Sequence, residues 1–206
     1  MRIGVLGTGT VGHAIASKLI ALGHEVMMGS RTANNPKAEA WASQARPRGH
    51  AGTFADTAKF GDIVFNCTHG ASSIAALHTA GEENLRGRIV VDVANVLPPD
   101  ARQTESLGEQ IQKAFPLAKV VKTLNTINCE VMVNPKALSA SHTLFVSGND
   151  AGAKEAIRGV LESFGWDDIL DLGDISTARA TESYLSLWLS ARKALGTAAF
   201  NIKVVR

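Results

Sequence analysis

Cysteines, long apolar runs and an excess of one charge are all scarce in this sequence. Two cysteines, Cys67 and Cys129, occur in 206 residues and form no C-x-x-C pair. This scarcity argues against a disulfide framework and a zinc knuckle, and it predicts a reducing, cytoplasmic location. No apolar run approaches the ~20 residues that a membrane-spanning helix needs. The first residues already resemble a strand and show no signal-peptide pattern, so we expect no membrane partner.

The charge balance and several missing motifs exclude further classes of protein. Lys and Arg number 21 against 19 Asp and Glu, which gives a net charge of +2. A chain so nearly neutral lacks the basic field of nucleic-acid-binding proteins, so we expect no nucleic-acid partner. The six histidines show no metal-ligand spacing, and neither a P-loop nor a G-x-S-x-G elbow is present. The sequence therefore predicts no bound metal, no phosphoryl transfer at a P-loop and no α/β-hydrolase.

Short apolar runs alternate with helix-like segments through the first 148 residues. The runs are rich in Val and Ile, as buried strands are, and strict alternation predicts a parallel sheet with helices on both faces. We expect strands at residues 3–6, 25–28, 63–66, 89–93, 120–124 and 143–146. We expect helices at residues 11–22, 36–45, 72–80 and 105–115. The predicted fold class is α/β, a Rossmann doubly wound and mostly parallel sheet.

The pattern changes after residue 148, where a short C-terminal strand and helix extension begins. We expect a helix at residues 151–164, a strand at 169–172 and a long helix at 176–199. No linker separates two units, so residues 1–206 are predicted to form a single domain, with its core at about 1–148 and the extension at about 149–206. The last helix carries an apolar stripe with helical spacing, made of Tyr184, Trp188, Ala191, Leu195 and Ala198. The stripe either packs on the chain's own sheet or forms a homodimer interface.

A glycine-rich turn follows the first predicted strand and opens the first predicted helix. It reads Gly7-Thr8-Gly9-Thr10-Val11-Gly12. This G-x-G-x-x-G motif is typical of dinucleotide binding when a strand precedes it and a helix follows. Gly7 allows the tight turn, Gly9 lets the backbone approach a pyrophosphate, and Gly12 lets the helix pack closely on the strand. We expect Gly29 and Gly70, at later strand ends, to pass close to the same ligand.

The end of the second predicted strand favours NADP(H) over NAD(H). An NAD-binding fold usually has Asp or Glu there, to accept hydrogen bonds from the ribose hydroxyls. This chain has Ser30, Arg31 and Thr32 instead. A guanidinium can bind a 2′-phosphate bidentately, so Arg31 is the expected phosphate ligand. Lys37, near the start of the next helix, either adds a second positive charge or is a solvated surface lysine.

Polar residues at later strand ends are the remaining candidates for the site. Ligands of doubly wound sheets lie beyond the carboxyl ends of the strands. Thr68 and His69 follow one strand, and Ala94 and Asn95 follow the next, so we expect them to line the nicotinamide half of the crevice. Asn125 lies in a polar cluster at a further strand end. His69 and Asn125 are weak catalytic candidates, since Asn, Thr and His also serve in turns and caps.

Several segments resemble the NADP-dependent oxidoreductases of the deazaflavin coenzyme F-420. The resemblance covers nearly the whole chain, including the terminal helix. It is carried by residues 1–9, by Gly29-Ser30-Arg31 with Lys37-Ala38-Glu39-Ala40, by Val120-Val121-Lys122, by Ser147-Gly148-Asn149-Asp150, and by Leu172-Gly173 with Ala178-Arg179-Ala180-Thr181-Glu182-Ser183. The same module resembles the cytosolic reductase domain of six-helix membrane metalloreductases, which pass NADPH electrons to flavin.

The resemblance implies hydride transfer between the nicotinamide of NADP(H) and the central ring of a deazaflavin. It also implies cofactor roles for four residues of this chain, Thr8, Ser30, Arg31 and Lys37. The chain departs from the family at Thr68-His69-Gly70-Ala71, where the family has a proline-containing turn, and at Asn125, where the family has a histidine. Because these loops form the side of the second substrate, the resemblance defines the cofactor better than the hydride acceptor.

These observations predict an NADP(H)-dependent oxidoreductase that acts on a small-molecule redox substrate. The expected second substrate is coenzyme F-420 or a flavin such as FMN or FAD. Two alternatives stay open. One is an NADPH-dependent reductase of another small substrate, such as a ferric chelate or an imine. The other is a binding protein that senses NADP(H) without turnover, since few obvious catalytic side chains are present.

Overall fold

One eight-stranded sheet organises the computed structural model, which describes residues 1–97 and 104–206. The strands lie in the order β3-β2-β1-β4-β5-β6-β7-β8. Neighbouring strands run parallel, except that β7 is antiparallel to β6. Their bounds are β1 Arg2–Leu6, β2 Glu25–Ser30, β3 Gly49–Thr53, β4 Ile63–Asn66, β5 Ile89–Asp92, β6 Lys119–Thr123, β7 Leu144–Gly148 and β8 Ile169–Asp171. The predicted Rossmann-type α/β fold is thereby confirmed.

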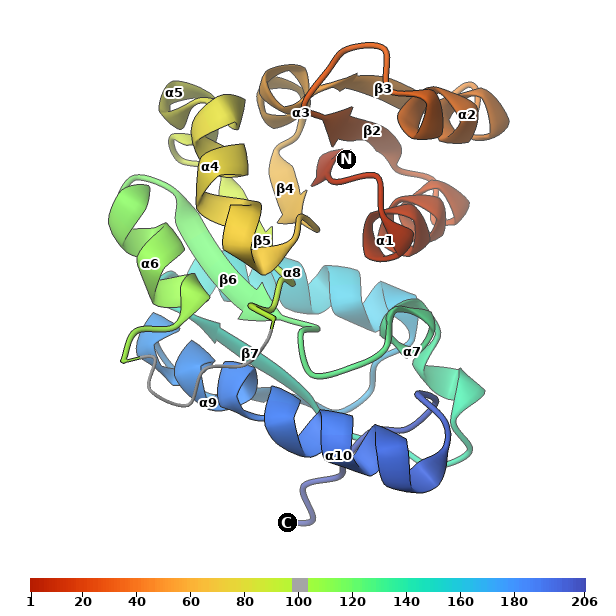
Figure 1. Ribbon diagram of the computed structural model, residues 1–206, viewed down its shortest axis with the longest axis vertical. Helices are drawn as coiled ribbons and strands as arrows, with labels where there is room; N and C mark the ends of the chain where they lie inside the picture. Colours follow the sequence, from red (N-terminus) through yellow and green to blue (C-terminus); the bar gives the residue numbers. More distant parts are fainter. Residues whose placement is uncertain (98–103) are drawn as a thin grey trace.

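Helices cover both faces of this sheet, with α4 and α6 on one side and α1 on the other (Figure 1). Their bounds are α1 Thr10–Ala21, α2 Pro36–Gln44, α3 Phe54–Phe60, α4 Gly70–Ala80, α5 Glu82–Leu85, α6 Leu107–Ala114, α7 Cys129–Val133, α8 Ala151–Phe164, α9 Ala178–Ser183 and α10 Leu185–Leu195. Short 3-10 turns lie at Pro135–Ala137 and Ile175–Thr177. Among the described residues no helix is both long and apolar enough to cross a bilayer.

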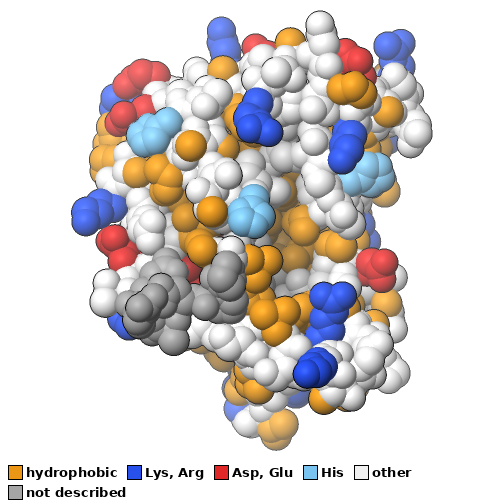
Figure 2. Space-filling model, in the orientation of Figure 1, with side chains coloured by type: hydrophobic (Ala, Val, Ile, Leu, Met, Phe, Trp, Pro, Cys, Tyr) orange, Lys and Arg blue, Asp and Glu red, His pale blue; other side chains and the backbone are white. Residues whose placement is uncertain are grey.

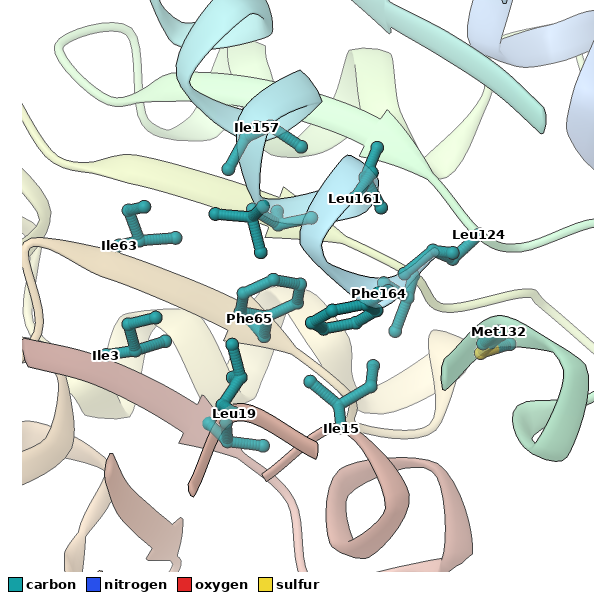
Figure 3. Close-up of a cluster of buried hydrophobic side chains, with 14 of the residues drawn as sticks. Ile3, Ile15, Leu19, Ile63, Phe65, Leu124, Met132, Ile157, Leu161 and Phe164 are labelled. Carbon is teal, nitrogen blue, oxygen red and sulfur yellow. The ribbon is translucent and has the colours of Figure 1, made fainter. Parts of the chain in front are cut away.

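The sheet separates two hydrophobic cores, because successive residues of a strand face opposite sides. On one side Phe65 of β4 packs with Ile15 of α1 and Phe164 of α8, as Figure 3 shows. On the other side Val64 of β4 packs with α3, α4 and α6. All four residues of β4 are buried, which explains the apolar run of Ile63, Val64 and Phe65 in the sequence.

The strand order reverses between β1 and β4. From β1 the chain first builds outward through β2 and β3, then returns to place β4 on the other side of β1. The loops that follow β1 and β4 therefore lead to helices on opposite faces and leave a crevice between them. In Figure 1 the ends of these two strands lie next to each other, between α4 and α1.

The edge of the sheet beyond β2 is an element that the sequence patterns did not predict. Strand β3 reads Gly-His-Ala-Gly-Thr and has no apolar run, and α3 follows it directly. A methyl group at Gly49 would lie 2.3 Å from the Ala45 Cβ, so glycine is needed for α2 to pack against this strand. Close packing here depends on glycine, which has no side chain, so a search for apolar residues cannot detect it.

The predicted long helix at residues 176–199 is wrong in its extent. The segment forms a 3-10 turn and then α9 and α10, with Tyr184 between the two helices. Helix α10 ends at Leu195, because Gly196 adopts a left-handed conformation with φ 68°. The remaining residues are extended, and the Ile202 carbonyl accepts a hydrogen bond from Thr143 N at 2.9 Å. How the chain divides into domains stays a prediction.

Helix α10 lies at the outer edge of the molecule and has no buried residue (Figure 1). Leu187 is 61% exposed and Leu195 is 59% exposed. Of the apolar stripe, Leu195 is exposed, whereas Tyr184, Trp188, Ala191 and Ala198 are half-buried, so the homodimer interface stays a prediction. Within the stripe, Trp188 stacks on the ring of Phe200, with ring centroids 5.5 Å apart.

We predict that the protein forms a homodimer through α10. Light scattering on the purified chain should give twice the mass of one chain. The double variant Leu187→Glu/Leu195→Glu should give the monomer mass, because burying carboxylates in an apolar contact is costly. Leu117→Glu is the matched control, since Leu117 is also an exposed leucine, at 49%, but lies before β6. A monomeric wild-type chain would contradict the prediction.

Candidate functional site

A cavity of about 790 Å³ lies where the ends of β1, β2 and β4 meet. The turn after β1 forms its floor, and residues from the β2 end and from α4 form its walls. The lining residues are Gly7, Thr8, Gly9, Ser30, Arg31, Thr32, Asn35, Phe54, Cys67, Thr68, His69, Ser72, Ala75, Ala76 and Thr79. Figure 2 shows this face hollowed near its centre, with hydrophobic side chains in the hollow and Lys, Arg and His side chains around it.

The glycine-rich turn is held together by contacts that no larger residue would allow. Gly7 has φ 117°, and its N–H donates to the Gly29 carbonyl at 2.9 Å. A methyl group at Gly12 would lie 2.1 Å from the Gly7 carbonyl oxygen, so helix and strand approach as closely as the sequence predicted. At Gly9 a methyl group would meet nothing within 4 Å. The space above Gly9 belongs to the cavity and is open to a ligand.

Helices α1 and α4 both begin at the cavity without a side-chain cap. Their N-cap residues, Gly9 and His69, accept no capping bond through a side chain, and neither helix has an acidic residue in its first turn. By contrast, side chains cap α2, α3, α6, α7 and α8. Unpaired N–H groups and the positive end of the helix dipole attract phosphate. The cavity therefore has two backbone sites that favour an anion.

The wall formed by the end of β2 carries an exposed cation and no acid. Ser30 is buried and fixes the turn, because its Oγ bonds to both the N–H and the carbonyl of Thr32. Arg31 is exposed at the cavity and forms no hydrogen bond or ion pair with any described residue. No Asp or Glu is among the described residues that line this cavity. Lys37 is exposed on α2 and does not line it.

The end of β4 places Thr68, His69 and Cys67 at the cavity. The Thr68 Oγ1 donates to Asn66 Oδ1 at 2.6 Å, so this hydroxyl fixes the loop as well as lining the wall. Burial, followed by the charge of Asp92, raises the pKa of the Cys67 thiol far above its usual range. A thiol with a raised pKa is mostly protonated and a poor nucleophile, so Cys67 contributes a small side chain to the wall.

Gly29 and Gly70, which we expected to pass close to a ligand, make room for the protein's own backbone and side chains. A methyl group at Gly29 would lie 2.5 Å from Thr57 Oγ1, and one at Gly70 would lie 2.3 Å from the Asn95 carbonyl oxygen. Strand β2 thus packs directly on α3, and the start of α4 packs on the loop after β5. Tertiary packing requires glycine at both positions, and their closeness to a ligand stays a prediction.

The predicted residues beyond β5 and β6 lie outside the lining of this cavity. Ala94 is buried, and its N–H and carbonyl both have partners inside the protein. Asn95 Nδ2 donates to the Asn125 carbonyl at 2.6 Å, and Asn125 Nδ2 donates to Asn95 Oδ1 at 3.1 Å. Leu124, buried before Asn125, has φ 64°, a conformation that costs energy in a branched residue. This reciprocal amide pair gives Asn125 a structural role, and its catalytic role stays a prediction.

Part of the cavity wall was missed from the sequence. Phe54 starts α3 and Asn35 caps α2, while Ser72, Ala75, Ala76 and Thr79 come from α4. Thr79 follows Ala75 by four residues and Ala76 by three, so it shares one helix face with both. Small residues on that face leave room for a flat ring beside Phe54. In the sequence, only the small residues of this helix could have indicated the cavity wall. Many buried helices have a face of small residues, so that signal is not specific.

A glycine-rich turn without a cap, at the point where the order of a parallel sheet reverses, defines the class of Rossmann dinucleotide-binding proteins. The family model of NADP oxidoreductases, coenzyme F420-dependent, matches residues 2–96. A crystal structure from Arthrobacter sp. FB24, assigned as an F420-dependent NADP-reductase, is 49% identical, covers 100% of both chains and has a TM-score of 0.92. The chain belongs to the F420-dependent NADP oxidoreductase family.

Two further proteins are similar to this chain at lower identity. The metalloreductase STEAP3 of Rattus norvegicus is 28% identical over 189 residues, which are 88% of this chain and 36% of that protein. The chain thus spans about a third of the length of the curated metalloreductases that it matches. A reductive aminase from Aspergillus terreus, solved with NADPH, is 19% identical with a TM-score of 0.70, and covers 95% of this chain and 62% of that one. That likeness shows the fold alone.

Alanine at two glycines of the turn should separate folding from binding. We expect Gly12→Ala to lower the free energy of unfolding by about 1–3 kcal/mol, because its methyl group overlaps the Gly7 carbonyl. We expect Gly9→Ala to change it by less than about 0.5 kcal/mol, since the added group enters open space. Urea unfolding measures both changes. Titration with NADPH should show that Gly9→Ala still weakens binding, and unchanged affinity would contradict this use of the cavity.

Proposed function

We propose that the cavity at the ends of β1, β2 and β4 binds NADP(H) and that the chain passes hydride between NADPH and a deazaflavin or flavin ring. The observation that carries the cofactor assignment is the wall of Ser30, Arg31 and Thr32 without a carboxylate. A free guanidinium at this position suits the 2′-phosphate of NADP(H). The ribose of NAD(H), with both hydroxyls free, is usually bound by an Asp or Glu at the same position.

The residues present fit this dinucleotide from end to end. The first-turn N–H groups of Thr10, Val11 and Gly12 would hold the pyrophosphate, because α1 begins there without a cap. Arg31 would hold the 2′-phosphate, and Lys37, in the first turn of α2, would add positive charge. Phe54 and the α4 face of Ala75 and Ala76 would enclose the adenine. Thr68 and His69 would border the nicotinamide half, with Ala94 and Asn95 behind them.

The deazaflavin or flavin acceptor is supported by the relatives and by the scarcity of acid–base groups. NADPH, when bound, supplies a hydride, and the acceptor ring takes up that hydride and a proton from solvent. Such a transfer needs no covalent nucleophile, and the raised pKa of Cys67 offers none. The protein contributes orientation and exclusion of water, since reacting atoms held ~3–3.5 Å apart react far faster than free ones. His69, exposed at the cavity, is the closest candidate for a proton donor.

The location of this reaction is proposed to be the cytoplasm. Cys67 and Cys129 are both free thiols, as expected of a protein from a reducing compartment. NADPH is also the reductant that such a compartment supplies.

Replacing Arg31 should separate the two nicotinamide dinucleotides. We expect Arg31→Ala to weaken NADPH binding about 10- to 100-fold, since a charge-assisted hydrogen bond contributes about 1.5–3 kcal/mol. NADH lacks the 2′-phosphate, so its affinity should change less than about threefold. Calorimetric titration with both dinucleotides measures the difference. Arg46→Ala is the control, because Arg46 is equally exposed but lines a separate groove. Equal weakening of NADPH and NADH would refute the 2′-phosphate assignment.

The acceptor is tested by following NADPH oxidation, through the loss of dihydronicotinamide absorbance, with a panel of acceptors. The panel holds a deazaflavin, FMN, FAD, a ferric chelate and a cyclic imine. Turnover with the deazaflavin or a flavin supports the proposal. Turnover with the ferric chelate or the imine alone would replace it with one of the other reductases. Tight NADPH binding without turnover of any acceptor would favour an NADP(H)-sensing protein.

A further inference from the structure

A lysine is completely buried beneath the strand ends, outside the residues assigned so far. The Lys122 Nζ, on β6, lies 2.7 Å from Asp92 Oδ2 and 2.8 Å from Glu182 Oε1, and it donates to the Ala94 carbonyl at 2.6 Å. The side chains of Lys122 and Asp92 are both 0% exposed. An ammonium group has three protons to donate, and each has an acceptor here.

Both carboxylates of this cluster have further donors, so no charge in it is left without a partner. Glu182 accepts from the N–H groups of Leu107 at 2.8 Å and Gly108 at 3.1 Å, which begin α6. Asp92 Oδ1 accepts from Asn66 Nδ2 at 2.8 Å. Burial on its own lowers the pKa of Lys122, but the nearby Asp92 and Glu182 charges outweigh it and raise that pKa above its usual value. The lysine is therefore charged.

The cluster connects the ends of three adjacent strands to the backbone that follows β5. Lys122 of β6 bonds to the Ala94 carbonyl, and Asp92 of β5 accepts from the Ala94 N–H at 3.2 Å. Asn66 of β4 joins the same carboxylate. Both polar groups of the Ala94 backbone are thus fixed from below, by side chains that cannot move without uncovering a buried charge.

The fixed backbone supports the wall of the cavity. Asn95, next along the chain, forms the reciprocal amide pair with Asn125. Its carbonyl oxygen packs against Gly70, the first residue of α4, so closely that a methyl group there would lie 2.3 Å away. Thr68 and His69, which line the cavity, come directly before Gly70. Movement at Ala94 would therefore displace the start of α4 and the loop after β6 together.

We propose that Lys122 and Asp92 are positioning residues for hydride transfer, which hold the Ala94–Asn95 backbone and through it fix the nicotinamide end of the crevice. This inference rests on the proposed function. Neither side chain lines the cavity, so both act through Ala94 and Asn95. This role explains why an ion pair is buried here. Two apolar side chains would fill the same space but would leave the Ala94 carbonyl without a hydrogen-bond donor.

The test compares the double variant Lys122→Met/Asp92→Asn with its two single variants. Lys122→Met leaves the Asp92 and Glu182 carboxylates without a cation and is expected to destabilise the fold strongly, whereas Asp92→Asn leaves Lys122 paired with Glu182 alone. The double change removes the Lys122–Asp92 ion pair, while Glu182 keeps the N–H donors of Leu107 and Gly108. The amide that replaces the Asp92 carboxylate retains an oxygen for the Asn66 and Ala94 donors. Lys154→Met is the matched control, because Lys154 also bonds an aspartate, Asp171, at 2.9 Å and a backbone carbonyl, that of Gly173, at 3.0 Å. That pair lies away from the cavity.

Hydrogen exchange gives the readout that needs no acceptor. In the folded double variant, residues 93–96 and 124–127 should exchange at least about tenfold faster, because the bonds that limit their local opening are lost. Residues 7–12 should stay as protected as in the wild-type chain. The emission spectrum of bound NADPH, which senses the surroundings of the nicotinamide, should shift in the double variant and not in Lys154→Met. Unchanged exchange and an unchanged spectrum would overturn the proposal.

Kinetics with the best acceptor then tests the effect on the reaction. The single-turnover rate of hydride transfer should fall about 10- to 100-fold, since a misplacement of about 1 Å costs that much. The dissociation constant of NADPH should change less than about threefold. A rate that is unchanged, or that falls only as far as binding weakens, would overturn the proposal. If the wild-type chain turns over no acceptor, the proposed function fails, and the exchange and emission results decide the positioning role by themselves.

Discussion

The close approach of Gly12 to the Gly7 carbonyl is the constraint on which the site depends. Without a Cβ at Gly12, α1 packs directly against the end of β1, so its first-turn N–H groups face the crevice. Because β4 pairs with β1 on the other side, the uncapped start of α4 reaches the same crevice. Two helix N-termini then share one cavity, and their unpaired donors favour an anionic ligand over any other.

The polar groups of the site fall into two sets: those free to bind a ligand, and those already paired within the protein. Arg31 has no partner among the described residues and no side chain caps α1, whereas Lys122, Asp92 and Glu182 are paired with one another and with nearby backbone and amide groups. Burying a charge costs several kcal/mol unless it is paired and hydrogen-bonded. The protein therefore confines its unpaired donors to the open cavity and keeps its buried charges paired beneath the strand ends, where they brace the surrounding loops.

Local patterns identified the elements whose side chains carry the signal. Strands β1, β2, β4, β5 and β6 are runs of Val, Ile and Met, and the Gly7–Gly12 turn has fixed spacing, so both were predictable. Strand β3 and α3 were not, because glycines at Gly49 and Gly52 permit close packing without an apolar pattern. The break at Tyr184 was also missed, since the residues of α9 and α10 together continue one helical period.

The sequence by itself determined the alternation of strands and helices and the glycine-rich turn. It also determined that the end of β2 carries Ser30 and Arg31 and no acidic residue. These are local properties, fixed by residue type and spacing along one segment. Only the tertiary structure decided that Gly29 and Gly70 serve packing, that Asn95 pairs with Asn125, and that Lys122 meets both Asp92 and Glu182. These contacts join segments far apart in the chain, and their geometry depends on the twist and order of the whole sheet.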